Sequence, residues 1–236
     1  MADFEILPPV SNKMTFVQLS KTVPSSWKSV FEECIDEFQY LDKIIKTEVF
    51  PEKKNVFRAF DLTPLEQVKV VLIGHEPYHD KRPNGKPRAQ GLAYSIAKDD
   101  DLTPALQNIF IELETEYPES PKHIHGDLSA WARQGVLLLN SSLTIEPGKL
   151  NSHGVIWHGF ISKVFQAIAE VNKNCIYLLW GNHAKEIISD YIPESSVKLF
   201  TSSPFGFAAN KGFIGCGHFK EVNRILTEKG MEPIEW

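Results

Sequence analysis

Short, nearly continuous apolar runs recur along the chain, separated by longer segments of mixed polarity. Residues 68–73, 135–139 and 175–180 are runs of this kind, and residues 197–200 form a shorter fourth. Runs of this length are typical of strands in a parallel sheet that is covered on both faces. The pattern therefore predicts a central, mostly parallel sheet of four strands.

Helical spacing of apolar residues fills several of the segments between these runs. It follows the capping residues Ser25-Ser26 as far as Leu41, and it recurs in residues 160–171 and 218–226. Thr103-Pro104 has the residue types preferred at the N-cap and first position of a helix. Because strands and helices alternate, we expect an α/β fold in which helices flank the sheet.

The sequence pattern changes once along the chain, near residue 24. Residues 1–24 contain three prolines and little periodicity, so we expect an irregular N-terminal arm there. Residues 25–236 then form a single α/β domain, a size that one hydrophobic core accommodates.

Polar segments follow the predicted strands directly. They are residues 75–79, Asn140, Asn182 and residues 201–205. Because the carboxyl ends of parallel strands meet at one edge of the sheet, we expect these segments to line a common crevice.

The composition and the N-terminal sequence disfavour membrane and secreted proteins. The chain is 42% hydrophobic and lacks an apolar run near the roughly 18 residues that cross a bilayer. Its three cysteines, Cys34, Cys175 and Cys216, are widely spaced, which favours reduced thiols. No basic segment followed by an apolar one begins the chain. We expect an intracellular protein, cytoplasmic or nuclear, that is not secreted and binds no membrane.

The formal net charge of −5 disfavours a protein that coats nucleic acid without specificity, yet permits a local basic groove. Four cations, Lys81, Arg82, Lys86 and Arg88, cluster after the first polar segment. They form either a solvated loop or a phosphate-attracting surface beside the crevice.

Residues His75-Glu76-Pro77-Tyr78-His79 match the zinc-protease pattern H-E-x-x-H. That chemistry needs a helix, because only a helix places two histidines four residues apart on one face. Here a strand and Gly74 come first, and Pro77 disfavours a helix between the histidines. We therefore expect a reactive turn without a metal or another cofactor.

Ordered sequence blocks from about residue 57 to residue 236 resemble the main uracil-DNA glycosylase family. The first block is a strand followed by Gly74-His-Glu-Pro-Tyr-His79, where the family has G-Q-D-P-Y-H. The others are Gly91–Ser95, His125-Gly126, Trp131, Gln134–Asn140, Leu143-Thr144, Asn151–His153, Leu178–Gly181, Ser203-Pro204, Gly212-Phe213, Gly215-Cys216, His218-Phe219 and Pro233–Trp236.

The resemblance implies an enzyme that flips uracil out of DNA, hydrolyses its N-glycosidic bond and leaves an abasic site. The amide of Asn140 offers a donor and an acceptor that match O4 and N3–H of uracil. Tyr78 would exclude the methyl group of thymine, and Tyr94 would stack on the base.

Four residues depart from the family pattern at chemical positions. His75 replaces Gln, Glu76 replaces the Asp that assists hydrolysis, Tyr94 replaces Phe, and Thr201 replaces the His that supports the departing uracil. Glu reaches roughly 1.5 Å further than Asp, so the surrounding site must have adjusted if Glu76 acts as the carboxylate. We hypothesise that His75 supplies the imidazole missing at position 201; the alternative is that His75 packs structurally.

The resemblance also places several residues at the DNA backbone. These are Pro77, His79, Ser152, His153, Asn182, Ser203 and Pro204, with Phe205 as a wedge that enters the duplex. Residues 205–211 form a segment about two residues longer than usual, so the wedge assignment stays open. We expect a monomer that acts on single- or double-stranded uracil-containing DNA; binding by a protein inhibitor stays undetermined.

Two other functions stay open at this point. One is a glycosylase for another modified or damaged base. The second is a catalytically weak protein that binds or senses uracil in DNA.

Overall fold

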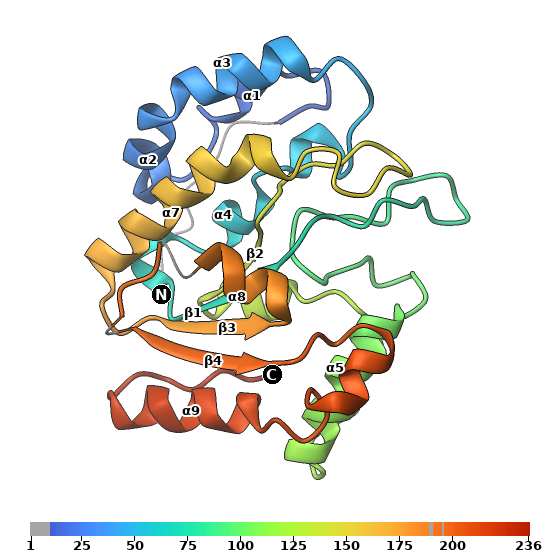
Figure 1. Ribbon diagram of the computed structural model, residues 1–236, viewed down its shortest axis with the longest axis vertical. Helices are drawn as coiled ribbons and strands as arrows, with labels where there is room; N and C mark the ends of the chain where they lie inside the picture. The colour runs from blue at the N-terminus through green and yellow to red at the C-terminus, as the bar shows by residue number, and fades with distance from the viewer. Residues whose placement is uncertain (1–9, 189–190, 195) are drawn as a thin grey trace.

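Four parallel strands form the centre of the computed structural model, which describes residues 10–188, 191–194 and 196–236 (Figure 1). The strands are β1 (Val70–Gly74), β2 (Val136–Asn140), β3 (Ile176–Trp180) and β4 (Val197–Thr201). Their order is β2-β1-β3-β4, and every pairing is parallel. The predicted sheet is confirmed.

Strands β1, β2 and β3 are buried at every residue, which explains their continuous apolar sequences. The helices around them are α1 (Phe16–Leu19), α2 (Lys28–Glu33), α3 (Ile35–Ile44), α4 (Arg58–Leu62), α5 (Pro104–Glu116), α6 (Ser129–Arg133), α7 (His158–Val171), α8 (Asn182–Ile188) and α9 (His218–Glu228).

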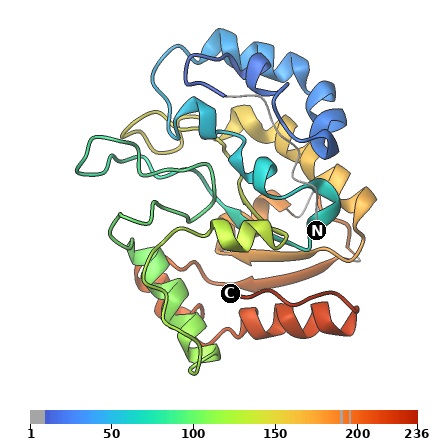
Figure 2. The ribbon, with the colours of Figure 1, turned by 180° about the vertical axis from the view of Figure 1, so that it is seen from behind.

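Helices α7 and α9 cover opposite faces of the sheet. Phe165 of α7 contacts Tyr177 of β3, with ring centroids 6.3 Å apart, whereas Phe219 of α9 lies 6.0 Å from Trp180. Positions 177 and 180 of a strand point to opposite faces, because side chains alternate along it. Both views show α1, α2 and α3 on the side of α7, and α5 beside α9 (Figures 1 and 2).

The predicted helices are confirmed in three places and broken in one. α5 begins as expected, with the Thr103 hydroxyl accepting a hydrogen bond from the N–H of Leu106. The helix predicted from residue 27 to 41 is instead two helices, because the backbone leaves the helical region at the fully buried Cys34. Tertiary packing overrides the local periodicity at this position.

The prediction of an irregular N-terminal arm is wrong for residues 16–19, which form α1. Thr15 and Gln18 build a capping box, and the Asp42 carboxylate accepts from the N–H groups of Phe16 and Val17. Phe16 and Leu19 are buried in the core, so this segment packs on the domain. Residues 1–9 of the predicted arm lie outside the described residues.

Two buried carboxylates of α5 hold the start of α9. Glu112 accepts from the N–H groups of Gly215 and Gly217, and Glu116 accepts from those of Phe219 and Lys220. These contacts fix the end of the loop that follows β4. Within the part of the chain that the structure describes, no helix is long and apolar enough to cross a membrane.

Candidate active site

A pocket of about 240 Å³ opens at the carboxyl ends of β1 and β2. The strand arrows point to this side, where the loops after β1 and β2 gather (Figure 1). Five separate chain segments contribute to the pocket, as expected for a crevice at the edge of a parallel sheet. Its lining consists of Gly74, His75, Glu76, Pro77, Tyr78, His79, Ala89, Gly91, Leu92, Tyr94, Asn140, Leu150 and Phe205.

Gly74 and Asn140 are neighbours in register at the ends of β1 and β2. A Cβ atom at Gly74 would lie 2.2 Å from Oδ1 of Asn140 and 3.0 Å from Cβ of Ala93. Only glycine therefore lets the Asn140 amide, which is 8% exposed, occupy this wall of the pocket.

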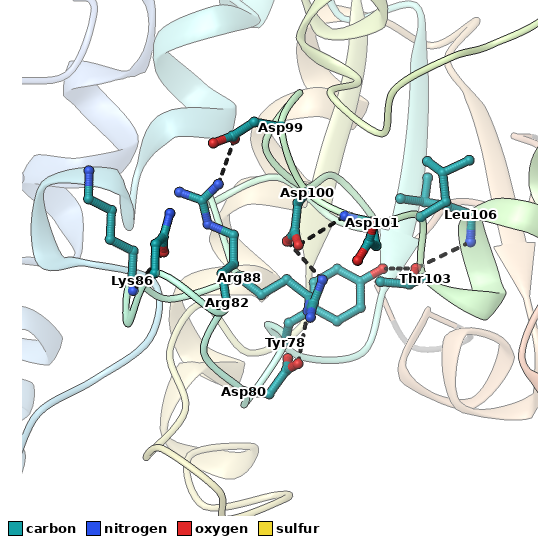
Figure 3. A network of polar contacts seen from close by, with 12 residues as sticks. Tyr78, Asp80, Arg82, Lys86, Arg88, Asp99, Asp100, Asp101, Thr103 and Leu106 are labelled. Carbon is teal, nitrogen blue, oxygen red and sulfur yellow. Dashed lines mark hydrogen bonds and ion pairs between the residues drawn. The ribbon is translucent and has the colours of Figure 1, made fainter.

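Two tyrosines form an adjoining wall. The Tyr78 hydroxyl donates to the carbonyl oxygen of Tyr94 at 3.1 Å and lies 2.9 Å from Oγ1 of Thr103. Figure 3 shows the contact of Tyr78 with Thr103 beside the ion pairs of the following loop. Burial raises the pKa of Tyr78 to about 12, against the opposing hydrogen bond to Thr103, so its phenol is neutral at physiological pH. The Tyr94 ring packs on Trp180, with centroids 5.6 Å apart.

Glu76 is held by the loop after β2. Its Oε2 accepts from the N–H of Asn151 at 2.8 Å, and Asn151 adopts a left-handed conformation with φ 57°. The neighbouring Leu150 lines the same pocket. This loop therefore closes on Glu76 and fixes its carboxylate.

His75 contacts a histidine that the sequence did not single out. The rings of His75 and His183 have centroids 3.5 Å apart. Nε2 of His183 lies 3.0 Å from Oγ of Ser141, which donates to the carbonyl oxygen of His75 at 2.7 Å. His183 directly follows Asn182, so its place after β3 was the one available sequence signal.

Residues 75–79 form a loop, and the helix required by the H-E-x-x-H interpretation is absent there. Among the described residues, no group of three or more His, Cys, Asp or Glu side chains is arranged to hold a metal ion.

Comparisons with known proteins identify the family. The model of the uracil DNA glycosylase superfamily matches residues 60–227. A uracil-DNA glycosylase of Francisella tularensis subsp. novicida is 42% identical over 191 residues, which are 80% of this chain and 84% of that protein. One from Yersinia pestis is 40% identical over 189 residues, 80% of this chain and 81% of that protein.

The chain belongs to the uracil DNA glycosylase superfamily. Its fold matches a crystal structure of mimivirus uracil-DNA glycosylase with a TM-score of 0.82 at 21% identity, over 95% of this chain and 90% of that chain. A second structure, from Nitratifractor salsuginis, gives a TM-score of 0.62 at 18% identity, over 88% of this chain and 94% of that chain.

Thr201, predicted as a catalytic residue of this glycosylase fold, is absent from the pocket lining. It ends β4, and its hydroxyl donates to the carbonyl oxygen of Gly212 at 2.6 Å. A hydroxyl has one proton, which this contact uses, so Thr201 has none to give a departing base.

Among the residues predicted at the DNA backbone, Pro77 and His79 line the pocket, and His79 is exposed. Ser152 and His153 serve the loop after β2: Ser152 accepts from the N–H of Glu146 at 2.8 Å, and His153 lies 2.9 Å from the Thr144 hydroxyl. Burial lowers the pKa of His153, which favours the neutral imidazole.

The remaining residues predicted at the DNA backbone lie in the segments after β3 and β4. Asn182 is exposed at the start of α8. Ser203 accepts from the N–H of Phe205 at 3.2 Å, and Pro204 is buried. Phe205 is 50% exposed and lies over Tyr94, whereas Phe207 is 79% exposed. Phe207 was not predicted as a site residue from the sequence.

The cation cluster of residues 81–88 is largely neutralised by carboxylates, as Figure 3 shows for its two arginines. Three of the four cations have ion pairs, at 2.6–3.3 Å: Arg82 with Asp99, Arg88 with Asp80 and Asp100, and Lys81 with Glu48. These contacts brace the loop beside Tyr78, so the interpretation as a phosphate-attracting surface gains no support from them.

Proposed function

We propose that this chain extrudes uracil from DNA and hydrolyses its N-glycosidic bond. Water adds to C1′ of the deoxyribose, the bond from C1′ to N1 breaks, and the base leaves to take up a proton. One observation supports this most strongly: Asn140, Tyr78, Tyr94 and Glu76 line one small pocket. All four come from one chain, so a monomer suffices.

Asn140 reads the edge of the base, since its amide satisfies both O4 and N3–H of uracil. Cytosine presents the reversed pattern and would leave buried polar groups unpaired, which costs about 1–3 kcal/mol for each group. Tyr78 is fixed by Tyr94 and Thr103, so its ring does not yield to the extra methyl group of thymine.

Glu76 stabilises positive charge on the sugar and orients the attacking water, as carboxylates do in glycoside hydrolysis. Asn151 holds Oε2, which leaves Oε1 to face the water. The contact with Asn151 supports the expected adjustment of the site to the longer carboxylate.

His75 donates a hydrogen bond to the oxygen of the departing uracil. It lines the pocket beside Glu76, whereas the Thr201 hydroxyl is directed to Gly212. At sites of developing negative charge, a donor of this kind typically lowers the activation free energy by about 2.7–4 kcal/mol.

Phe205 and Phe207 divide two tasks at the DNA surface. Phe205 covers the pocket mouth beside Tyr94, and the more exposed Phe207 enters the space that the flipped nucleotide vacates. The exposed His79 and Asn182 contact phosphates, which position a strand without reading its sequence.

The test is single-turnover cleavage of oligonucleotides that carry one uracil, one thymine or one cytosine at the same position. Uracil-specific abasic sites are the expected result. Equal cleavage of all three, or tight uracil-dependent binding without cleavage, would contradict the proposal.

A further inference from the structure

We propose that His183 is a positioning residue that fixes the imidazole of His75 against the departing base. The inference rests on the role proposed for His75 and deepens it. His183 lies outside the pocket lining, so it acts through His75 and not on the substrate.

A hydrogen-bond chain fixes how His183 is protonated. Ser141 uses its one hydroxyl proton to donate to the carbonyl oxygen of His75 at 2.7 Å. The contact of 3.0 Å between Ser141 and Nε2 of His183 is therefore one in which Nε2–H donates. His183 is thus the Nε2–H tautomer, and it reaches the main chain of His75 through Ser141.

Ring contact provides a second hold on the side chain of His75. With centroids 3.5 Å apart, the two rings cannot both be protonated without strong repulsion. Burial, together with the nearby His75 and His158, lowers the pKa of His183 to about 4. His183 is therefore neutral at physiological pH.

These two contacts restrain both the main chain and the side chain of His75. The Ser141 hydroxyl anchors the carbonyl oxygen of His75, and the N–H of Ser141 donates to the carbonyl oxygen of Gly74 at 3.0 Å. The His183 ring contacts the imidazole of His75 and so limits its rotation. A misplacement on the order of 1 Å can cost about 100-fold in rate, so removal of His183 should lower the chemical step without much effect on binding.

The experiment is a double-mutant cycle with His75→Ala and His183→Ala, read by single-turnover cleavage and by uracil-DNA affinity. We expect His183→Ala to lower the cleavage rate about 10- to 100-fold with affinity within about 2-fold. The double variant should lose no more rate than His75→Ala alone, because both changes remove one function.

Ser141→Ala provides a milder second variant that keeps the ring contact, and a smaller rate loss is expected from it. His158→Ala, a neighbouring exposed histidine, is the matched control and should cleave within about 2-fold of wild type. The chemical shifts of His75, followed by ¹⁵N NMR, should change in His183→Ala and stay unchanged in His158→Ala.

Independent, additive losses in the double variant would overturn the inference, as would a His183→Ala variant with wild-type rates. If His75→Ala cleaves at the wild-type rate, the role proposed for His75 fails and this inference fails with it. If wild type does not cleave uracil DNA, the proposed function itself is wrong.

Discussion

Gly74→Ala should separate catalysis from folding in this glycosylase. The added Cβ would lie 2.2 Å from Oδ1 of Asn140, against an ordinary contact of at least 3.4 Å. The Asn140 amide must therefore move by about 1 Å, since the backbone of β1 is fixed by strands on both sides. A displacement of this size costs about 100-fold in rate when it affects a positioned group.

Gly74→Ala should lower the free energy of unfolding only moderately, although it strongly lowers the cleavage rate. The nearest atom belongs to the end of a side chain that borders the open pocket, and the contact with Ala93 is 3.0 Å. Overpacking of this kind costs about 1–3 kcal/mol, so the variant should remain folded at 25 °C.

Single-turnover cleavage of a uracil oligonucleotide and thermal unfolding measure the two effects. Gly154→Ala is the matched control, because its nearest neighbour is an oxygen atom 4.0 Å away and its φ is −50°. The reasoning about Asn140 would be refuted if Gly74→Ala cleaved as fast as Gly154→Ala.

Four further predictions test other parts of the site and of the fold. Glu76→Gln keeps an acceptor for Asn151 but loses the charge, so single-turnover cleavage should fall about 100- to 1000-fold at unchanged melting temperature; a loss under 10-fold would contradict the carboxylate role. Phe207→Ala should slow cleavage of uracil in a duplex and spare single strands, whereas Phe205→Ala should affect both; equal effects on the two substrates would count against Phe207 as the wedge. Tyr78→Ala opens the wall that excludes a methyl group, so thymine removal should become measurable beside uracil removal, and its absence would place specificity elsewhere. Burial, with Glu112 beside it, raises the pKa of Glu116 to about 7, so the stability that its neutral form contributes is lost as pH rises from about 4.5 through 7. Urea unfolding should show wild type losing stability relative to Glu116→Gln between pH 5 and pH 8, and a constant difference would contradict the assigned cause.

Much of the site follows from sequence because strand direction converts distant segments into neighbours. The apolar run before Gly74 and the one before Asn140 predict parallel strands whose ends meet, and the pocket contains both residues. Tyr78 and Tyr94 come from the resemblance to the family, and both line the same pocket.

The remainder depends on contacts that no spacing encodes. His183 gains its place from ring contact with His75 across two strand ends. The Thr201 hydroxyl donates to the carbonyl oxygen of Gly212 because the long loop after β4 brings Gly212 beside it. The first helix was missed although Thr15 and Gln18 carry a capping box, because the helix is short and owes its place to packing of Phe16.

The most direct test of the central claim compares wild type with Glu76→Ala on a single-stranded oligonucleotide with one uracil. The thymine oligonucleotide serves as the substrate control. The account predicts abasic sites from uracil only, formed by wild type and reduced at least 100-fold in the variant. Equal rates for wild type and Glu76→Ala would contradict it, because the carboxylate would then have no part in breaking the bond.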